Sequence, residues 1–400
     1  MNTKLNEIKV LKDPIWGYIH VEYKIIWDLI KTKEVQRLKR IRQLGGAFTV
    51  YHSAEHSRFG HCLGVYEVCQ KMINQIPNLI NCISEHDMIV VYIAALLHDV
   101  GHSPYSHAHE AVFNTDHEQY TINILTKESS IHELLNSYDD NLCYEVASVI
   151  DHTHKNKLLS QLISSELDAD RMDYLLRDAY FTGTTYGVFG FERILRTLRV
   201  VDNNIVVKES GIKAVEDFLM SRYHMYWQVY YHPVARSYEL VLKQLYNRVK
   251  YLKDHNQLTM LDVFDNCIKD EYMTNSEHYY YDDHVCNYGI LCLSKHPDKV
   301  VSDLAKRLLN RDLFKYLPNN ETNLKKIRKH LKESNYDLDY YMVKDSIYQK
   351  AYEPYTKELG QNFFVLTDKN EIKEISEVSV IVSALSKSKE KEIKKIYFPE

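Results

Sequence analysis

The sequence predicts a mainly α-helical protein with one small β-hairpin and a mixed α+β region at its C-terminal end. Apolar residues recur at helical spacing through most of the first half, as in Val35, Leu38 and Ile41. Only 12 glycines and 8 prolines occur among 400 residues, so few positions interrupt such helices. Two β-rich runs flank the Asp-Asn-Asn at 202–204, which suits a tight turn, and predict a hairpin near 200–208.

The other elements follow in order along the chain. An apolar helix is expected over MIVVYIAALL, residues 88–97, and helices resume at Ile212 and run to about Leu252. Beyond about Tyr272 the periodicity weakens, and residues 341–400 have the pattern of mixed α and β structure. The charged run KSKEKEIKK, residues 387–395, is interpreted as a solvated helix face.

Composition and charge exclude several classes of protein. The net charge of -5 argues against a dedicated nucleic-acid binder. The longest apolar run is too short for a bilayer, which needs about 20 residues, and the first residues lack the apolar core of a signal peptide. The seven cysteines form no CxxC pair, so neither a zinc ribbon nor a disulfide framework is indicated. We therefore expect a cytoplasmic protein with no membrane partner.

A histidine-rich segment at the end of the apolar helix predicts a metal site. It contains HDVGHSPYSHAHEAVFNTDH, with five histidines between His98 and His117. Neighbouring side chains on a helix point about 100° apart, so His98 and Asp99 reach one ion only from an unwinding last turn. Gly101 and Pro104 supply that helix end. Imidazole with carboxylate suits Mn, Fe, Zn or Ni, with Mg at an oxygen-rich side.

Two further segments offer ligands to close the site. His61 opens a helix in SRFGHCLGVYEVCQ, and Asp170 lies in SSELDADRMDYLLRD, where Asp170, Tyr174 and Asp178 share one helical face. Each signal alone is weak, because a lone histidine is more often a satisfied surface or core residue and an HD dipeptide arises by chance in many chains. The combination is what predicts a divalent metal centre.

These segments resemble the signature blocks of HD-domain deoxynucleoside triphosphate triphosphohydrolases, which include bacterial enzymes and a human enzyme with a sterile-alpha-motif domain. The resemblance rests on RFGHCLGV, LLHDVGHSPYSH, DHEQ and ELDADRMDYLLRD. It extends over DPIWGYI, RLKRIRQLGGAF, VDNN, SRYHMYWQVYYHPVAR and, more weakly, RDLFKYL. It implies an HD-domain helical core over residues 1–270, which would include the hairpin, followed by a mixed α/β region over 271–400 with an oligomerisation or regulatory role.

The resemblance also implies the reaction and its catalytic groups. Water would cleave a dNTP at the α-phosphorus and release deoxynucleoside and intact triphosphate. The implied metal ligands are His61, His98, Asp99 and Asp170. His107 stands at the position of the general acid, Glu110 and His117 at positions that orient it, and His102 at an α-phosphate contact. Histidine suits these roles because its unperturbed pKa is near 6.5.

Substrate contacts are implied in the same way, residue by residue. The implied phosphate contacts are Arg58, Arg171 (a lysine in the human enzyme) and Arg222. The implied sugar contacts are Gln43 and Asp178 at the 3′-hydroxyl, Tyr174 at C2′, and Tyr230. Tyr226 stands where the human enzyme has histidine, and core packing is an equal interpretation of it. Arg222, Tyr226 and Tyr230 are expected on one helical face.

The resemblance also has implications for the oligomeric state and activation of the protein, and two other functions stay open. Relatives imply a homotetramer or dimer with a nucleotide activator, but Lys31, Gln36 and Lys39 stand where the human guanine site has an acid, a glutamine and an arginine. That change argues against guanine-specific activation. Two other functions stay open: a different HD phosphohydrolase, such as a nucleotidase or phosphodiesterase, and a non-catalytic nucleotide sensor or single-strand binder.

Overall fold

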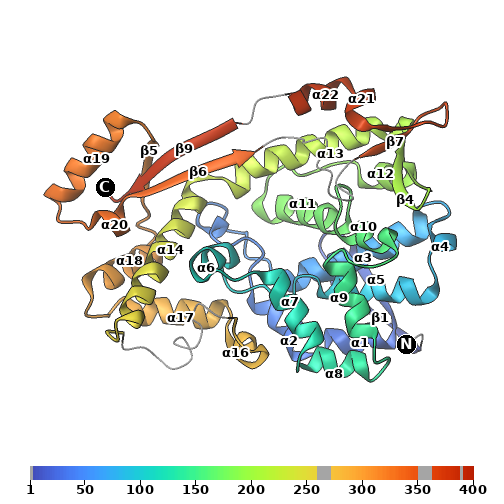
Figure 1. The fold of residues 1–400 in the computed structure, drawn as a ribbon, viewed down its shortest axis with the longest axis horizontal. Coiled ribbons are helices and arrows are strands. Elements are labelled where there is room, and N and C mark those ends of the chain that lie inside the picture. Colours follow the sequence, from blue (N-terminus) through green and yellow to red (C-terminus); the bar gives the residue numbers. More distant parts are fainter. Residues whose placement is uncertain (1–2, 259–271, 350–362, 388–390) are drawn as a thin grey trace.

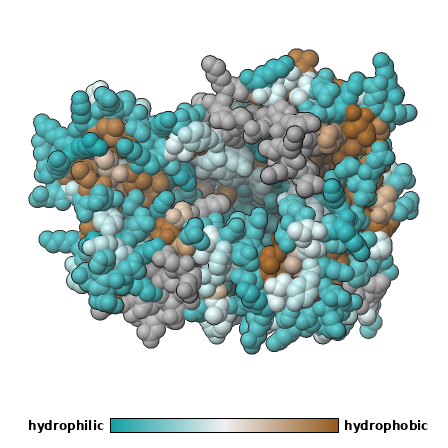
Figure 2. Space-filling model, viewed as in Figure 1, coloured by the Kyte–Doolittle hydropathy of each residue, from teal (hydrophilic) through white to brown (hydrophobic). Residues whose placement is uncertain are grey.

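The computed structural model describes residues 3–258, 272–349, 363–387 and 391–400, and it is mainly helical, as the sequence predicts (Figure 1). Among these described residues, no helix combines the length and the apolar character needed to cross a bilayer. In the space-filling view most of the visible face is hydrophilic, with small apolar areas between the polar ones (Figure 2). The large apolar side chains therefore lie mostly inside, where they hold the helices together.

The chain begins with a two-stranded antiparallel hairpin that the sequence patterns did not reveal. Strand β1 (Lys4–Asp13) pairs with β2 (Gly17–Tyr23). The Asp13 carboxylate closes the turn, because its Oδ1 accepts hydrogen bonds from the backbone N–H groups of Ile15 and Trp16 at 2.8 and 3.0 Å. The hairpin packs against the helical core through β2.

Three long helices position the predicted metal ligands. They are α3 (Arg58–Gln75), α5 (Glu85–Leu97) and α11 (Ala169–Thr182). A capping box at Ser84 starts α5, and every side chain from Ile89 to Leu97 is buried, so this apolar helix is the centre of the bundle. The other helices of this half are α1 (Lys24–Ile30), α2 (Lys33–Arg37), α4 (Leu79–Cys82), α6 (Ser106–Phe113), α7 (His117–Thr126), α8 (Ser130–Asn136), α9 (Leu142–Ile150), α10 (Lys157–Ile163) and α12 (Phe191–Thr197).

The predicted hairpin near 200–208 is confirmed, and it belongs to a larger sheet. Strands β3 (Leu198–Val201) and β4 (Asn204–Lys208) are joined through Asp202 and Asn203, whose φ angles of 49° and 60° are the left-handed values of a tight hairpin turn. β4 then pairs in parallel with β7 (Phe364–Leu366), and β7 pairs with β8 (Ile372–Glu374). The C-terminal region therefore returns to the first half of the chain and completes its sheet.

The helices expected from Ile212 to about Leu252 are interrupted between Met225 and Pro233. Helix α13 (Ile212–Met225) passes into a single π turn at Tyr226–Tyr230, and α14 (Pro233–Asp254) starts anew with proline in its first turn. Because of this π turn, the spacing of Arg222, Tyr226 and Tyr230 is not that of one regular α-helix, although the Tyr226 and Tyr230 rings still pack on each other and line the same cavity. Such turns often occur at functional sites.

The C-terminal region combines helices with a three-stranded sheet of order β5-β9-β6. Its strands are β5 (Lys315–Pro318), β6 (Val343–Gln349) and β9 (Lys391–Phe398). Its helices are α16 (Asn275–Tyr280), α17 (Asp283–Leu293), α18 (Lys299–Asn310), α19 (Glu321–Glu333), α20 (Leu338–Tyr341), α21 (Ile375–Val378) and α22 (Val380–Lys387). The mixed α+β character predicted here is confirmed.

The charged run at 387–395 is not a solvated helix face. Residues 388–390 lie outside the described part of the chain, and residues 391–395 form the first half of β9, the middle strand of the sheet. Lysine and glutamate favour helices only weakly, and pairing with β5 on one side and β6 on the other outweighs that preference.

Two hydrophobic clusters form the core. The first is built around α3, α5 and α11, and the second joins α6 and α14 to α17, α18 and the three-stranded sheet. Buried residues of the second cluster therefore come from both sides of residue 270, for example Phe113 and Tyr246 before it and Leu304 after it. A division into domains at 270 stays a prediction.

Candidate metal centre and active-site cavity

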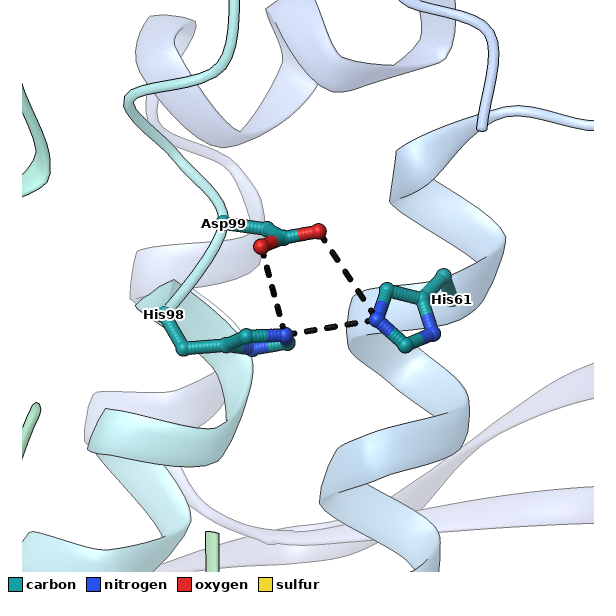
Figure 3. A group of neighbouring side chains, drawn as sticks. All are labelled: His61, His98 and Asp99. Atoms are coloured by element: carbon teal, nitrogen blue, oxygen red, sulfur yellow. Dashed lines mark hydrogen bonds and ion pairs between the residues drawn. The ribbon is translucent and has the colours of Figure 1, made fainter. Parts of the chain in front are cut away.

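The four predicted metal ligands converge from three helices. His61 lies in the first turn of α3, Asp170 in the first turn of α11, and His98 and Asp99 directly follow the last residue of α5. The polypeptide unwinds at this point, so the adjacent His98 and Asp99 side chains both face the same space (Figure 3). The helix-end geometry predicted for the HD dipeptide is therefore present.

Donor atoms of His61, His98 and Asp99 all lie within 4.8 Å of one another, the spacing of ligands around one ion, and Asp170 lies beside the two histidines. The Nε2 atoms of His61 and His98 are 3.3 Å apart, and Asp170 Oδ1 lies 2.9 Å from the first and 3.7 Å from the second. Asp99 Oδ1 lies 3.5 Å from His98 Nε2, and Asp99 Oδ2 lies 3.7 Å from His61 Nε2. Metal–ligand bonds of 2.0–2.2 Å bring ligand atoms to about these separations.

The other imidazole nitrogens are already engaged. His61 Nδ1 is 2.8 Å from Asp173 Oδ2, and His98 Nδ1 is 2.9 Å from the carbonyl oxygen of Ala95. Because oxygen atoms accept these bonds, each Nδ1 carries the proton and each Nε2 can offer a lone pair. Two Nε2 lone pairs at 3.3 Å repel each other unless a proton or a metal cation lies between them, so the donor set can hold a divalent metal.

The charges around the site explain its protonation without metal. Burial lowers the pKa of the His61 imidazolium, but hydrogen bonds to Asp170 and Asp173 and their charges outweigh burial and raise that pKa to about 10. Burial raises the pKa of Asp170, but hydrogen bonds to His61 and His98 hold it well below its usual range. Without metal, a proton on His61 compensates the carboxylates, and a metal ion must displace it.

A cavity of about 500 Å³ adjoins the metal centre and contains most of the predicted site residues. Of the predicted ligands, Asp99 and Asp170 line it. The predicted catalytic and substrate residues that line it are Gln43, Arg58, His102, His117, Tyr174, Asp178, Tyr226 and Tyr230. Its wall also includes Arg236 and Glu239 of α14, which the sequence analysis did not single out. The cavity volume is in the range of small-molecule sites.

A second polar cluster borders the metal ligands. The rings of His102 and His117 stack with centroids 3.9 Å apart, and His117 Nδ1 is 3.0 Å from Glu110 Oε1. Burial lowers the pKa of His117, but the hydrogen bond to Glu110 outweighs burial and raises it. His102 Nε2 lies 3.2 Å from Asp99 Oδ1, so the cluster touches the metal centre. His107 lies on α6 between these residues, and its side chain is outside the described part of the structure.

Only one of the three predicted phosphate contacts lines the cavity. Arg58 lines the cavity and donates to Asp99 at 2.5 Å. Arg171 and Arg222 are not among the residues that line it, and both donate to one carboxylate, that of Glu166, at 3.2 and 2.6 Å. Glu166 lies between the two guanidinium groups and offsets their mutual repulsion, which keeps a pair of cations close to Asp170 and Tyr174.

Three of the predicted sugar contacts, Tyr174, Asp178 and Tyr230, lie together in the cavity wall. The Tyr174 and Tyr230 rings meet edge to face with centroids 6.1 Å apart, and the Tyr230 hydroxyl donates to Asp178 Oδ2 at 2.8 Å. Tyr226 also packs edge to face on Tyr230, with centroids 5.1 Å apart. Tyr174 and Tyr226 thus contact a neighbouring ring as well as the cavity, so the position of Tyr226 is compatible with both interpretations of it.

Comparison with known proteins identifies the family. Residues 58–178 match the model of the HD domain, and residues 189–400 match that of the HD associated region. The chain belongs to the HD-domain family. The HD domain spans all four predicted metal ligands, and the chain is an HD-superfamily phosphohydrolase of the branch related to dNTP triphosphohydrolases.

Three relatives show how far this similarity extends. The protein YwfO of Bacillus subtilis is 42% identical and covers 100% of this chain and 94% of its own length. The crystal structure of a phosphohydrolase from Bacteroides thetaiotaomicron superimposes with a TM-score of 0.87 at 29% identity, over 98% of this chain and 100% of its own. A deoxynucleoside triphosphate triphosphohydrolase homologue (SAMHD1 homolog) from Dictyostelium discoideum is 29% identical over 80% of this chain and 62% of its own.

Sequence reasoning missed the residues that support the HD-domain ligands. Asp173 accepts from His61, from the Trp16 indole and from both Nε and Nη2 of Arg177 at 2.8 and 2.9 Å. Arg177 Nη1 continues to Asp13 Oδ2 at 2.9 Å, so the N-terminal hairpin reaches the metal site through buried charges. Both DPIWGYI and ELDADRMDYLLRD contained these residues, but only their approach in space reveals the connection.

Proposed function

We propose that this HD-domain phosphohydrolase cleaves dNTPs at the α-phosphorus and releases deoxynucleoside and inorganic triphosphate. One observation carries the proposal: a single cavity is lined by the carboxylates of the metal centre and by Gln43, Tyr174 and Asp178, which match sugar contacts of the triphosphohydrolases. The name of the Dictyostelium relative, a deoxynucleoside triphosphate triphosphohydrolase, supports the same reaction.

In this proposal the four ligands hold a divalent ion. Such an ion lowers the pKa of a bound water and polarises a phosphoryl oxygen, whether it is Mn, Fe, Mg, Zn or Ni. Arg58 and His102 face the α-phosphate from the cavity wall. His107 protonates the leaving 5′-oxygen in this proposal, and the His117–Glu110 pair has the orienting role that the resemblance implies. A positioned acid contributes about 10²–10⁴-fold in rate.

Sugar selection tests the proposal most sharply. If Tyr174 packs against C2′, the 2′-hydroxyl of a ribonucleotide meets an aromatic face and loses its hydrogen bonds, which costs about 1–3 kcal/mol. We expect kcat/KM for dGTP to exceed that for GTP by at least about tenfold, since 1.4 kcal/mol is a factor of ten. Tyr174→Ala should narrow this ratio.

The experiment incubates metal-loaded protein with each dNTP and with GTP, and separates the products by anion-exchange chromatography. Deoxynucleoside with triphosphate is expected. Release of monophosphate, or equal turnover of GTP and dGTP, would instead favour the nucleotidase and phosphodiesterase alternatives. Absence of any turnover with all candidate metals would favour the non-catalytic sensor.

Assembly and activation are further parts of the proposal. We infer a homo-oligomer, a tetramer or dimer, from the family relation. At the positions of the human guanine site, Lys39 Nζ donates to Gln36 Oε1 at 2.8 Å and Lys31 Nζ pairs with Asp28 at 2.7 Å. Because a lysine, Lys31, stands at the position of the acid, an activating nucleotide would need other contacts than that guanine site provides.

A further inference from the structure

His56 is a buried histidine outside the predicted site. It lies two residues before Arg58, and its side chain is only 4% exposed. Its ring stacks on Phe181 of α11, with centroids 4.5 Å apart and planes 13° apart, and its Nε2 lies 2.8 Å from Asp178 Oδ1. Since a carboxylate only accepts, Nε2 carries the proton and donates it.

The other ring nitrogen of His56, Nδ1, does not form a hydrogen bond of this kind within the described part of the chain. Nδ1 is buried and has no hydrogen-bond partner among the described residues. A buried acceptor without a donor destabilises the fold, and an apolar side chain stacked on Phe181 would avoid that cost. The bond from Nε2 to Asp178 is therefore what distinguishes histidine from a hydrophobic residue here.

Asp178 is held on both of its oxygens. His56 donates to Oδ1, and the Tyr230 hydroxyl donates to Oδ2 at 2.8 Å. An ionised carboxylate offers about four acceptor positions, so two donors fix its plane and leave others for a ligand. Asp178 lines the cavity although its side chain is only 2% exposed, which leaves it little freedom to turn.

His56 also fixes the backbone of Gln43. The Gln43 N–H donates to the His56 carbonyl oxygen at 2.9 Å, and the Arg58 N–H donates to the Ile41 carbonyl at 2.9 Å. This short antiparallel pairing sets the distance between the two segments. The Gln43 Oε1 atom is buried and has no hydrogen-bond partner among the described residues, so the cavity wall contains an acceptor that still lacks a donor.

We propose that His56 is a positioning residue for recognition of the sugar 3′-hydroxyl. Through its ring it orients the Asp178 carboxylate, and through its carbonyl it places Gln43, so one residue sets the spacing of the two groups that a 3′-hydroxyl would meet. The inference rests on the proposed function, since it names how that cavity selects a deoxynucleotide with an intact 3′-hydroxyl.

The test compares dGTP with 2′,3′-dideoxy-GTP, which lacks only the 3′-hydroxyl. The wild-type protein should prefer dGTP in kcat/KM. In His56→Ala the Asp178 carboxylate is released, so this preference should fall about tenfold, mainly through KM for dGTP, whereas values for the dideoxy substrate change little. His56→Gln should restore most of the preference, because its amide N–H can donate to Asp178 from a similar position.

The matched control is His52→Ala, an exposed histidine four residues earlier on the same segment, which should leave the preference unchanged. Equal losses on both substrates in His56→Ala, without rescue by His56→Gln, would show a merely structural role and overturn the inference. If His56→Ala does not fold, Tyr230→Phe removes the other donor to Asp178 and should lower the same preference.

A measurement of nucleotide binding tests the role of His56 independently of the proposed hydrolysis. Calorimetric titration of the metal-stripped protein should show tighter binding of dGTP than of dideoxy-GTP, and His56→Ala should abolish the difference. If the wild type shows this difference, His56→Ala abolishes it and no triphosphate is released, the proposed reaction fails and the role of His56 stands. If it binds both nucleotides equally, the role of His56 is refuted whatever the reaction.

Discussion

At the scale of single residues, the sequence could indicate the four side chains that converge as candidate metal ligands, but it could not indicate the residues that support them. His61, His98, Asp99 and Asp170 stand in local motifs that a sequence displays directly. Asp173 and His56 act through contacts across 112 and 122 positions of the chain. No local pattern marks such a pair, because a buried carboxylate or imidazole cannot be distinguished from any other in the sequence until its neighbour in space is known.

The protonation of His61 leads to a prediction about stability in the metal-stripped protein. The pKa of His61 is about 10 in the folded chain, against about 6.5 when unfolded. Below pH 6.5 both states hold the proton and the full stabilisation is present, whereas between pH 6.5 and 10 only the folded state holds it. The free energy of unfolding should therefore fall by about 1 kcal/mol per pH unit between pH 7.5 and 9.

Urea denaturation of metal-stripped protein at several pH values measures this slope. Asp173→Asn removes one of the two carboxylates that raise the pKa of His61, so the slope should become smaller in that variant. Saturating metal should reverse the trend, because the ion binds the unprotonated imidazole and competes better as pH rises. A metal-stripped wild type whose stability does not fall over this range would contradict the assignment.

At the scale of elements, the helices were predictable from periodicity, whereas strands without a local signal were missed. The turn between β3 and β4 can be predicted from the sequence, because Asp and Asn tolerate the positive φ angles that it requires. β9 shows no such signal, since a lysine-rich segment becomes a strand only through pairing with β5 and β6. The close approach of α3 and α11 could not be predicted from the sequence either, although it depends on one glycine, Gly64.

That glycine gives a prediction about the packing of α3 on α11. A Cβ added at Gly64 would lie 1.8 Å from Asp173 Oδ1 and 2.4 Å from Arg177 Nη2, so Gly64→Ala must push these buried charges away. We expect a loss of about 1–3 kcal/mol in stability, the usual cost of overpacking, together with weaker metal binding as the Asp173–His61 bond shifts.

Gly60→Ala on the same helix is the matched control. A Cβ there would meet Arg177 Nη1 at 3.5 Å, an ordinary contact, so the usual helix preference for alanine over glycine should make this variant neutral or slightly more stable. Thermal unfolding and metal titration of Gly64→Ala and Gly60→Ala measure the two effects, the loss of stability and the weaker metal binding. Equal behaviour of the two would mean that the spacing of α3 and α11 does not depend on Gly64.

At the scale of the whole molecule, the cavity lies where the two hydrophobic clusters meet. Tyr174 of α11 packs against the first cluster, whereas Arg236 and Glu239 belong to α14, the main helix of the second. Arg236 Nη2 forms an ion pair with Asp345 Oδ1 of β6 at 2.9 Å, so the C-terminal sheet contacts a residue of the cavity wall. The sequence could not show this arrangement, because it depends on the approach of β6 to α14, whose paired residues lie 109 positions apart in the chain.

The shared second cluster predicts that the two halves of the chain unfold together. All three tryptophans, Trp16, Trp27 and Trp227, precede residue 270, so their fluorescence reports only on the first half. Leu304 on α18 is fully buried in the second cluster, and Leu304→Ala should destabilise it by about 2–5 kcal/mol. Because that cluster includes α6 and α14, we expect the tryptophan-monitored transition to shift by the full amount. Leu309→Ala, on the same helix but 45% exposed, should shift it far less. An unchanged tryptophan transition in Leu304→Ala would instead show two independent domains.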